Sequence, residues 1–366
     1  MNKPRILFIV PLPPPVHGSA MVSQYIRQSL LIQDSFQVDF VNLSTSRKMD
    51  EIRKINPMKF VRFVGNYFCV LGKLLTHRYD ACYLAITCHG MGFLKDAPFV
   101  LLCKLLSRNV IIHQHNQGMS KDVNRWFYRW LMPWVYRNTE VILLSWRLYP
   151  DVQQIVRKEQ VWICPNGIPD VSQPEEPEHS VASVPRLFFL SNLLISKGIM
   201  VLLDACQQLQ EKGYVFRCDY VGGETPEMDK VHFEEEIRLR GLEGVVFYQG
   251  PRYGAEKEAF FQQADIFVQP TFDDCFPLTL VEAMQHGLPI VSTDEGAIPD
   301  MVIHGENGFI CRRKEVDPLV NAIEKLLNDN ELRKQMGENG RCRYKERYTL
   351  KAFEKKLQEI LSGILN

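Results

Sequence analysis

The sequence has no excess of charge of either sign, with 43 Lys and Arg residues against 43 Asp and Glu residues in 366. This balance excludes the broad basic surface that nonspecific nucleic-acid binding needs, and it excludes a strongly acidic tail. We therefore expect no nucleic-acid partner. Any preference for a charged ligand must come from a local group of residues.

The sequence also lacks paired cysteine motifs and long apolar runs. Its 10 cysteines include no C-x-x-C pair, and most lie in apolar stretches such as "LLCKLL". This pattern is typical of reduced core cysteines in a cytoplasmic protein, and not of a zinc site or a disulfide framework. The first apolar run, "RILFIV", ends too early for a signal peptide, and no uninterrupted run reaches the roughly 18 residues of a membrane span.

Short apolar runs alternate with longer amphipathic stretches, and this alternation occurs in two series. The first runs from "RILFIV" through "VDFVNL", "DACYLAI" and "NVIIHQH" to "EVILLS", and the second from "RLFFLSN" through "FRCDYVG", "VVFYQG" and "DIFVQP" to "PIVST". The pattern predicts an α/β protein with two doubly wound, Rossmann-like domains at 1–170 and 186–348. Ligands of such sheets bind at the carboxyl ends of the strands, so the cleft between the domains is the expected site.

The segments between and after these domains lack strand patterns. Residues 171–185 are rich in Pro, Ser and Glu, which predicts a linker. Near the end of the chain we expect two helices, with breaks near Gly337 to Gly340 and at Thr349. The last helix, 349–366, is expected to return to the N-terminal domain.

The stretch "FDDCFPLTLVEAMQHGLPIVSTDEGAIPDMV" (272–302) predicts a helix that begins where a strand ends. Pro277 suits the first helical position and Gly287 suits the stop. The free N–H groups of such a helix start favour a phosphate. Glu282, further into the helix, could accept hydrogen bonds from a ribose diol, and Asp274 could reach sugar hydroxyls. Acidic residues also favour first turns for purely structural reasons.

This stretch resembles the signature of the retaining glycosyltransferases of family 4, also called group 1, which have the two-domain GT-B fold. In that family two glutamates with seven residues between them bracket a Phe-Gly/Pro helix start. The resemblance extends to "LFFLSNLLISKGIMVLLDA", to "VIIHQHNQG" and to "PLPPPVHGSAMVSQYI". It therefore implies GT-B architecture, with two Rossmann-like domains facing a central cleft: an acceptor-side domain at 1–170 and a nucleotide-sugar-binding domain at 186–348.

The resemblance also implies roles for individual residues, with neither a metal nor an organic cofactor. The charge of the leaving diphosphate would be met by Lys197, the helix start and backbone amides near Gly18. Catalytic roles fall to Lys197, Asp274 and His115. Substrate-binding roles fall to Glu282, Gly18, Phe276, Pro277, Leu278, Asn192, Gly198, Arg252 and His113.

Two residues depart from the family pattern. Asp274 stands where the family usually has Glu, which could shift donor choice or geometry. Asn192 stands where an Arg commonly lies, so one cation is missing near the diphosphate. Arg252 is the candidate to replace it.

His113 and His115 lie two residues apart on a predicted strand, so their side chains face the same side. A lone histidine in an apolar strand is most often a satisfied core residue. The carboxyl end of the strand is where ligands bind, and His115 is the closer of the two to the following turn. We therefore expect the functional role for His115.

The implied activity is transfer of a hexose or N-acetylhexosamine from a UDP- or GDP-linked donor to a saccharide or lipid-linked saccharide, in bacterial surface polysaccharide synthesis. Two alternatives remain: a nucleoside diphosphate sugar epimerase of the same fold, and a nucleotide-sugar-binding scaffold with weak or no turnover. A nicotinamide dehydrogenase is disfavoured because no G-x-G-x-x-G follows the first strand.

Two stretches, 57–79 and 125–137, concentrate aromatic and basic residues, and the second holds three Trp and three Arg. Amphipathic helices packed on the sheet explain each stretch taken singly. The alternative is an interfacial surface that brings a cytoplasmic enzyme to the inner face of the membrane and to a lipid-linked acceptor.

Overall fold

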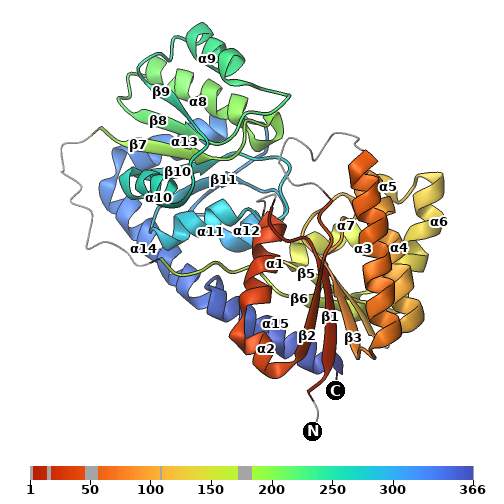
Figure 1. The fold of residues 1–366 in the computed structure, drawn as a ribbon. Coiled ribbons are helices and arrows are strands. Elements are labelled where there is room, and N and C mark those ends of the chain that lie inside the picture. Colours follow the sequence, from red (N-terminus) through yellow and green to blue (C-terminus); the bar gives the residue numbers. More distant parts are fainter. Residues whose placement is uncertain (1–2, 15–17, 46–56, 108, 172–183, 366) are drawn as a thin grey trace. The chain divides into compact units, whose positions relative to one another are not determined.

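The computed structural model describes residues 3–14, 18–45, 57–107, 109–171 and 184–365. The chain divides into two compact units (Figure 1). The N-terminal unit contains residues 1–167 and 350–366, and the C-terminal unit contains residues 168–349. Most of the predicted linker, 171–185, lies outside the described residues.

The N-terminal unit is built on a parallel six-stranded sheet with the strand order β2-β1-β3-β4-β5-β6. The first series of apolar runs forms the first five strands, as predicted, while the short edge strand β6 was not expected. The strands are β1 (Arg5–Val10), β2 (Gln37–Asn42), β3 (Ala81–Leu84), β4 (Asn109–Gln114), β5 (Glu140–Leu143) and β6 (Val161–Ile163).

Helices cover both faces of this sheet, which is why its inner strands are apolar without alternation. In Figure 1, α3, α4 and α6 lie on one face and α1, α2 and α15 on the other. The helices are α1 (Gly18–Gln28), α2 (Leu30–Ser35), α3 (Pro57–Thr76), α4 (Gly90–Leu106), α5 (Met119–Asp122), α6 (Trp126–Tyr136), α7 (Tyr149–Val152) and α15 (Leu350–Leu365).

The C-terminal unit repeats this architecture with a second parallel six-stranded sheet, in the order β12-β11-β10-β7-β8-β9. The strands are β7 (Arg186–Leu190), β8 (Arg217–Val221), β9 (Val246–Gly250), β10 (Ile266–Gln269), β11 (Ile290–Thr293) and β12 (Gly308–Cys311). The helices are α8 (Ile199–Glu211), α9 (Lys230–Leu239), α10 (Gly254–Gln263), α11 (Leu278–Gln285), α12 (Ile298–Met301), α13 (Val316–Asn328) and α14 (Asn330–Arg347). Two doubly wound α/β units confirm the predicted fold class.

The helix break expected near Gly337 is wrong, because α14 continues through this residue to Arg347. A Cβ on Gly337 would lie 1.9 Å from the carbonyl oxygen of Gly287, which ends α11. The glycine therefore serves close packing of α14 on α11, and does not stop the helix. Gly287 itself ends α11 as predicted, with φ of 69° and its N–H donating to the Met284 carbonyl.

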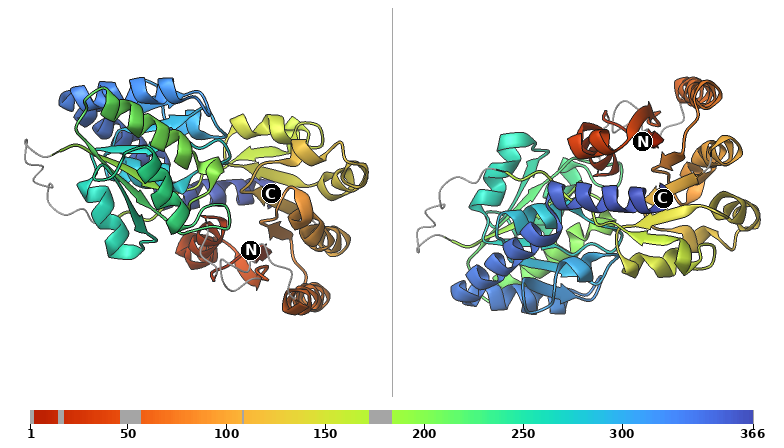
Figure 2. Two further views of the ribbon diagram at one scale, coloured as in Figure 1. Left: turned by 90° about the horizontal axis from the view of Figure 1, so that it is seen from above. Right: turned by 90° about the horizontal axis from the view of Figure 1, so that it is seen from below.

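The last helix, α15, belongs to the N-terminal unit, although the preceding 182 residues form the other unit. It contacts α2, and Gly363 lies against the ring of Trp162 on β6. Phe353, Leu357, Ile360 and Leu361 are its buried residues. The views in Figure 2 show this dark blue helix running beside the strands of the N-terminal unit.

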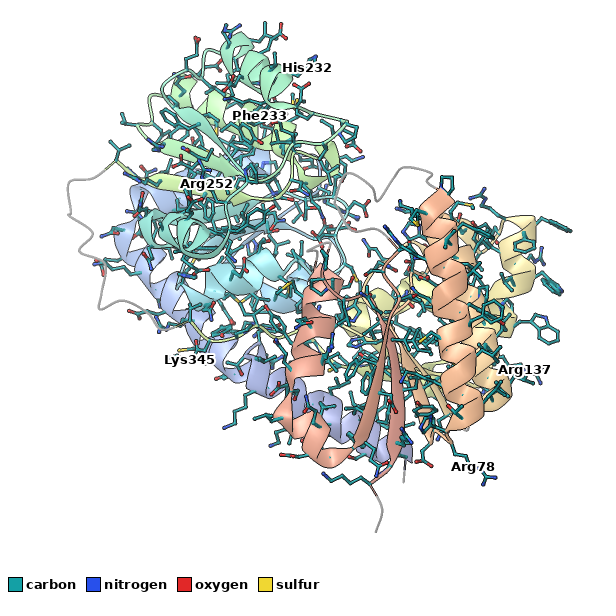
Figure 3. All side chains as sticks on the ribbon, viewed as in Figure 1. Arg78, Arg137, His232, Phe233, Arg252 and Lys345 are labelled. Carbon is teal, nitrogen blue, oxygen red and sulfur yellow. The ribbon has the colours of Figure 1, made fainter. Side chains whose placement is uncertain are left out.

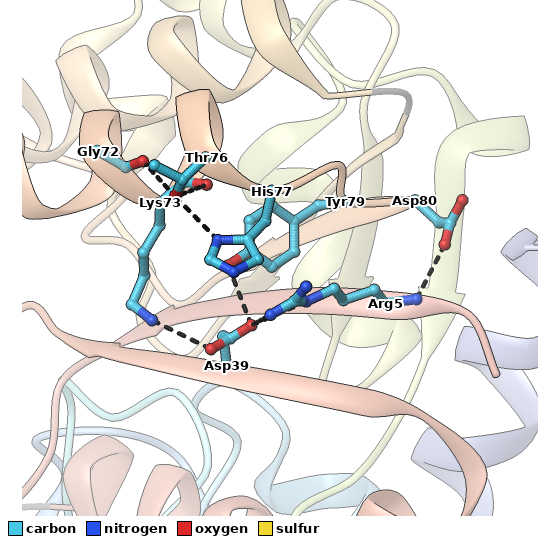
Figure 4. A network of polar contacts seen from close by, with 8 residues as sticks. All are labelled: Arg5, Asp39, Gly72, Lys73, Thr76, His77, Tyr79 and Asp80. Carbon is cyan, nitrogen blue, oxygen red and sulfur yellow. Dashed lines mark hydrogen bonds and ion pairs between the residues drawn. The ribbon is translucent and has the colours of Figure 1, made fainter. Parts of the chain in front are cut away.

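A polar network around Asp39 connects β1, β2 and α3 near the amino end of the first sheet (Figure 4). Asp39 on β2 accepts hydrogen bonds from Arg5 on β1, from Lys73 on α3 and from the Tyr79 hydroxyl. Burial alone would raise the pKa of Asp39, but hydrogen bonds from Lys73, Arg5 and Tyr79 lower it on balance. One carboxylate thus ties two strands to α3 and to the loop before β3.

Within the described ranges, no helix combines the length and apolar character needed to cross a bilayer. Eight of the 10 cysteines are buried, all are free thiols, and Cys69 and Cys342 are exposed. The cysteines therefore lie mostly in the cores, as the sequence predicts.

Candidate functional site

At the carboxyl edge of the second sheet, the loop after β7 packs directly on the loop after β10. The first loop forms a single turn, Ile195–Lys197, and Gly198 follows with φ of 81°. A Cβ on Gly198 would lie 2.1 Å from the carbonyl oxygen of Pro270, so a glycine is required there. The Phe272 N–H donates to the Ser196 carbonyl at 2.9 Å, which holds the two loops together.

This packing places Lys197 against the acidic turn, which is the turn of Asp273 and Asp274 between β10 and α11. Its Nζ lies 2.5 Å from Oδ2 of Asp274 and 2.9 Å from the Asp273 carbonyl oxygen. The side chains are 19% and 17% exposed, respectively, so the pair is shielded yet reachable. The two expected catalytic residues of this unit therefore form one ion pair, an arrangement that spacing in the sequence did not reveal.

Gly296 fixes the acidic turn from the other side. It follows β11 with φ of 51°, and a Cβ there would lie 2.2 Å from the Asp274 carbonyl oxygen. The N–H of Ala297 donates to the Cys275 carbonyl at 3.0 Å. The loop after β11 thus rests on the backbone of Asp274 and Cys275, and it sets where the Asp274 carboxylate points.

The helix that follows the acidic turn begins at Leu278, one residue later than predicted, with Pro277 as its N-cap. Phe276 is buried with its ring 6.0 Å from that of Tyr348, whereas Leu278 is half-buried. The first N–H groups of α11 therefore lie at the carboxyl edge of the sheet, and α11 begins four residues after Asp274 in the sequence.

Glu282, on the second turn of α11, forms an ion pair of 2.7 Å with Lys257 of α10. Burial raises the pKa of this carboxyl above its usual value, although the charge of Lys257 opposes the shift. Lys257 was not expected from the sequence, because nothing in the spacing of α10 distinguishes it from a solvated lysine. The pair offers one acceptor and one donor to a ligand with vicinal hydroxyls.

Asn192, one of the two residues that depart from the family pattern, forms a hydrogen bond that joins two loops. Its side-chain oxygen accepts the Gly223 N–H at 3.0 Å, and the Leu193 N–H donates to the Gly223 carbonyl at 2.8 Å. These bonds join the ends of β7 and β8. A Cβ on Gly222 would lie 1.8 Å from the Ser191 carbonyl oxygen, so the two loops are in close contact.

Two cations lie at the same edge of the sheet, at the ends of other strands. Arg252 follows β9, two strands from β7, and its nearest acidic partner is Glu256 at 3.9 Å (Figure 3). Lys314 follows β12, with its Nζ 4.6 Å from the centre of the Phe272 ring. Since Phe272 is bonded to the Lys197 loop, Lys314 is a second candidate for the missing cation, and the sequence pattern did not single it out.

The N-terminal unit contains a pocket of about 870 Å³ at the carboxyl ends of β1 to β4. It is lined by residues from the loops after these strands and from the first two turns of α1, α3 and α4: Pro11, Ser19, Leu43, Ser44, Thr45, Lys59, Phe60, Phe63, Ala85, Ile86, Thr87, Met91, Gly92, Leu94, Lys95, Asp96, His115 and Asn116. Gly18 is exposed and begins α1, one residue before the lining residue Ser19.

The structure separates the two histidines. His115 lines the pocket, whereas His113 is fully buried, with Nδ1 in hydrogen-bonding contact with the Tyr83 hydroxyl. Burial lowers the pKa of His113 well below its usual value, and the adjacent His115 acts in the same direction. The ring of His113 is therefore neutral and internal. This corrects the expectation of a substrate contact for His113 and assigns it to the core.

Asp96 is the pocket residue that sequence reasoning missed. It lies on α4, is 2% exposed, and its Oδ2 accepts the Thr87 N–H at 2.9 Å. Burial raises the pKa of this carboxyl, although Lys95 opposes the shift. The sequence held an indication of this residue, because Asp96 stands in the strongly apolar stretch "GMGFLKDAPFVLLCKLL". A carboxylate that is buried in such a helix needs a polar or charged partner.

A comparison with protein families matches residues 174–343 to the group 1 glycosyl transferases. This range contains the Lys197–Asp274 pair, α11 with Glu282, and the Gly296 loop. The match thus falls on the C-terminal unit, where the acidic turn and the lysine loop meet.

Two curated relatives match stretches of similar length. The capsular polysaccharide biosynthesis glycosyltransferase CapM of Staphylococcus aureus is 25% identical over 177 residues, 48% of this chain and 46% of CapM. The D-inositol 3-phosphate glycosyltransferase of Corynebacterium aurimucosum is 32% identical over 155 residues, 41% of this chain and 36% of that protein. The chain thus spans less than half the length of these curated relatives.

The likeness in structure extends over both units. The Anabaena protein Alr3699/HepE, solved in complex with UDP, superposes with a TM-score of 0.73, covering 99% of this chain and 100% of that chain at 19% identity. At this identity the likeness bears on the fold alone. It confirms the predicted GT-B architecture of two doubly wound units.

Proposed function

We propose that the protein transfers a sugar from a nucleoside diphosphate donor to a saccharide or lipid-linked saccharide acceptor, because residues 174–343 match the group 1 glycosyl transferases. The observation that carries this proposal is the Lys197–Asp274 pair beside the start of α11, all on one edge of the second sheet. A cation and free helix N–H groups suit a leaving diphosphate, while the acids suit hydroxyls.

The proposed donor is a uridine-linked hexose or N-acetylhexosamine. HepE of similar fold was solved with UDP, which supports uridine over guanosine. The proposed setting is bacterial surface polysaccharide synthesis on the cytoplasmic side, supported by the likeness to CapM. We further propose transfer with retention and without a metal, in which Lys197 and the α11 start stabilise the charge of the leaving group.

Binding of the nucleotide tests this proposal. UDP at a hundred times its dissociation constant should stabilise the protein by about 2.7 kcal/mol, seen as a higher melting temperature. Glu282→Ala should abolish this rise, because the pair with Lys257 would no longer hold the ribose. The raised pKa of Glu282 adds a pH test: the response should weaken, as pH falls, at a higher pH than for an ordinary glutamate.

GDP, ADP and the sugar conjugates of all three nucleotides complete the screen. Glu243→Ala is the matched control, since Glu243 is exposed and its nearest basic partner, Arg238, lies 3.8 Å away. Wild type and the control should respond alike to UDP. No response to any nucleotide, or an equal response from Glu282→Ala, would contradict the assignment of this edge to the donor.

Contact with a membrane surface is a further part of the proposal. On α6, Trp126, Trp130 and Trp134 follow one another at four-residue spacing and are 88%, 62% and 59% exposed. Arg125 and Arg129 are exposed beside them, and Arg137 points outward just after the helix (Figure 3). Exposed indole rings with adjacent cations suit an anionic lipid interface.

Replacing these three tryptophans together by serine should lower partition onto vesicles with anionic phospholipid by about tenfold or more, because each indole contributes apolar area to the interface. Co-sedimentation with vesicles measures the effect. Trp146→Ser is the control, since Trp146 is also exposed but lies outside α6. Equal partition of the triple variant and the control would remove the membrane from the proposal.

A further inference from the structure

Two ionisable side chains beside the Lys257–Glu282 pair have no role in the function proposed above. Glu258 follows Lys257 on α10, and His286 is the C-cap of α11. The Lys257 Nζ lies 2.7 Å from Oε1 of Glu282 and 3.6 Å from Oε1 of Glu258. The other oxygen of Glu258, Oε2, lies 2.9 Å from Nε2 of His286. The four groups therefore form a row, in the order Glu282, Lys257, Glu258, His286.

The contacts of the His286 ring require a proton on both of its nitrogens. Nδ1 lies 2.9 Å from the carbonyl oxygen of Glu282, which can only accept a hydrogen bond, so Nδ1 carries a proton. Nε2 faces the carboxylate of Glu258, which would repel the lone pair of an unprotonated nitrogen. The ring is therefore an imidazolium in this arrangement, and the charges alternate along the row.

The position of this ring is fixed by packing. His286 stacks on Phe261 of α10, with ring centroids 4.7 Å apart and 12° between the planes, and its side chain is 7% exposed. α14 also packs on α11 and approaches Gly287 through Gly337; among the described residues it forms no ion pair with His286. The ring therefore cannot follow the Glu258 carboxylate if that carboxylate moves.

The charge on His286 decides where the Glu258 carboxylate lies. Oε2 of Glu258 is buried and receives no hydrogen bond from the described residues, so it depends on a nearby positive charge. When the imidazolium loses its proton, the ammonium of Lys257 is the cation that remains beside Glu258. Two glutamates then compete for one ammonium, and the contact of Lys257 with Glu282 weakens.

Glu282 already responds to these charges. Burial raises the pKa of its carboxyl, and Lys257 opposes this shift. The negative charge of Glu258 raises the pKa further, whereas the positive charge of His286 lowers it. The charges of Glu258 and His286 therefore reach the carboxylate that would hold the ribose.

We propose that His286 and Glu258 are positioning residues for the nucleotide. Protonated His286 holds the carboxylate of Glu258, and Lys257 therefore stays with its partner on α11. This inference rests on the proposed function, because it concerns the same nucleotide site. The sign follows from the charge: affinity for UDP is full while His286 is protonated, and it falls as the pH rises through the titration of the ring. Together with the loss expected on the acid side for Glu282, UDP binding should have a bell-shaped pH dependence.

Isothermal titration calorimetry of the full chain with UDP, from about pH 6.5 to about pH 8.5, tests the inference. The affinity of the wild type should fall by about tenfold over this range, and His286→Ala should have the lower affinity at every pH. Adding Glu258→Gln to His286→Ala should restore the affinity that the wild type has at the acid end, because a neutral amide no longer draws the ammonium of Lys257. The ionisation of UDP is the same for all variants, so it cancels in their comparison.

The single and double variants both lose the stacking on Phe261, so a loss of packing cannot explain a difference between them. His232→Ala is the matched control, since His232 pairs with Asp229 at 2.8 Å in the same unit but lies exposed on α9. It should follow the wild type at every pH.

Three outcomes would overturn the inference while leaving the nucleotide site in place. They are wild-type binding of UDP that does not weaken as the pH rises, a pH profile of His286→Ala equal to that of the wild type, and a double variant that binds UDP no better than His286→Ala. Absence of UDP binding by the wild type at any pH would instead overturn the proposed uridine donor, and this inference with it.

Discussion

Lys197→Ala should lower the turnover of the donor sugar by about 10²–10³-fold, the usual cost of removing one preorganised charge or donor from a developing anion. The ammonium is fixed by the Asp274 carboxylate and by the Asp273 carbonyl, so it is already placed when the diphosphate leaves. Alanine removes the charge and leaves Asp274 without this partner. Release of nucleoside diphosphate, with the donor that the melting screen selects, measures the effect.

The comparison of turnover with binding makes this prediction specific. Binding of the free nucleoside should change little in Lys197→Ala, because the nucleoside carries no phosphate. Lys212→Ala is the control: Lys212 follows α8 in the same unit and pairs with Glu324 at 2.7 Å. If Lys197→Ala reduced nucleoside binding and turnover by the same factor, Lys197 would not be the group that faces the leaving diphosphate.

The second large effect is expected from Gly296→Ala. A methyl group there would lie 2.2 Å from the Asp274 carbonyl oxygen and 2.8 Å from that of Cys275, and φ is 51°. The loop after β11 must therefore move off the acidic turn. We expect the free energy of unfolding to fall by about 3 kcal/mol or more, as for other backbone clashes at special φ values, and turnover to fall as well because Asp274 is displaced.

Gly305→Ala separates the two causes of this loss. Gly305 has φ of 85° but no heavy atom within 4 Å of an added Cβ, so its substitution carries the backbone strain without the clash. Urea unfolding of both variants should give the larger loss for Gly296→Ala, and a normal turnover for Gly305→Ala. Equal losses of stability would mean that the contact with the acidic turn contributes little.

Much of the fold was predictable because parallel strands that are buried on both faces have continuous apolar sequences. Ten strands follow from such runs. The two that were missed, β6 and β12, are edge strands of three and four residues, too short for a periodic signal. The helix break predicted at Gly337 was wrong for another reason. A glycine in a helical sequence indicates either the end of the helix or close packing against a neighbour. Here the neighbour is Gly287, 50 residues away in the sequence.

The sequence predicted individual site residues but not the contacts between them. Asp274, Glu282 and Lys197 were predicted as site residues because they occupy motif positions in the sequence. Their partners in the fold depend on which loops meet, as with Lys257 opposite Glu282 and the contact of Lys197 with Asp274. Asp96 belongs to no motif, and its burial beside a pocket becomes visible when α4 is placed on the sheet.

The assignment of α15 to the N-terminal unit has a consequence for synthesis on the ribosome. Residues 3–167 emerge first, yet the helix that covers the unit through Phe353, Leu357 and Ile360 is made after all 182 residues of the other unit. Until α15 has been made, the nascent N-terminal unit therefore exposes the apolar surface that this helix covers. The N-terminal unit is therefore completed only after the C-terminal unit has been synthesised, and its exposed apolar surface is open to chaperones in that interval.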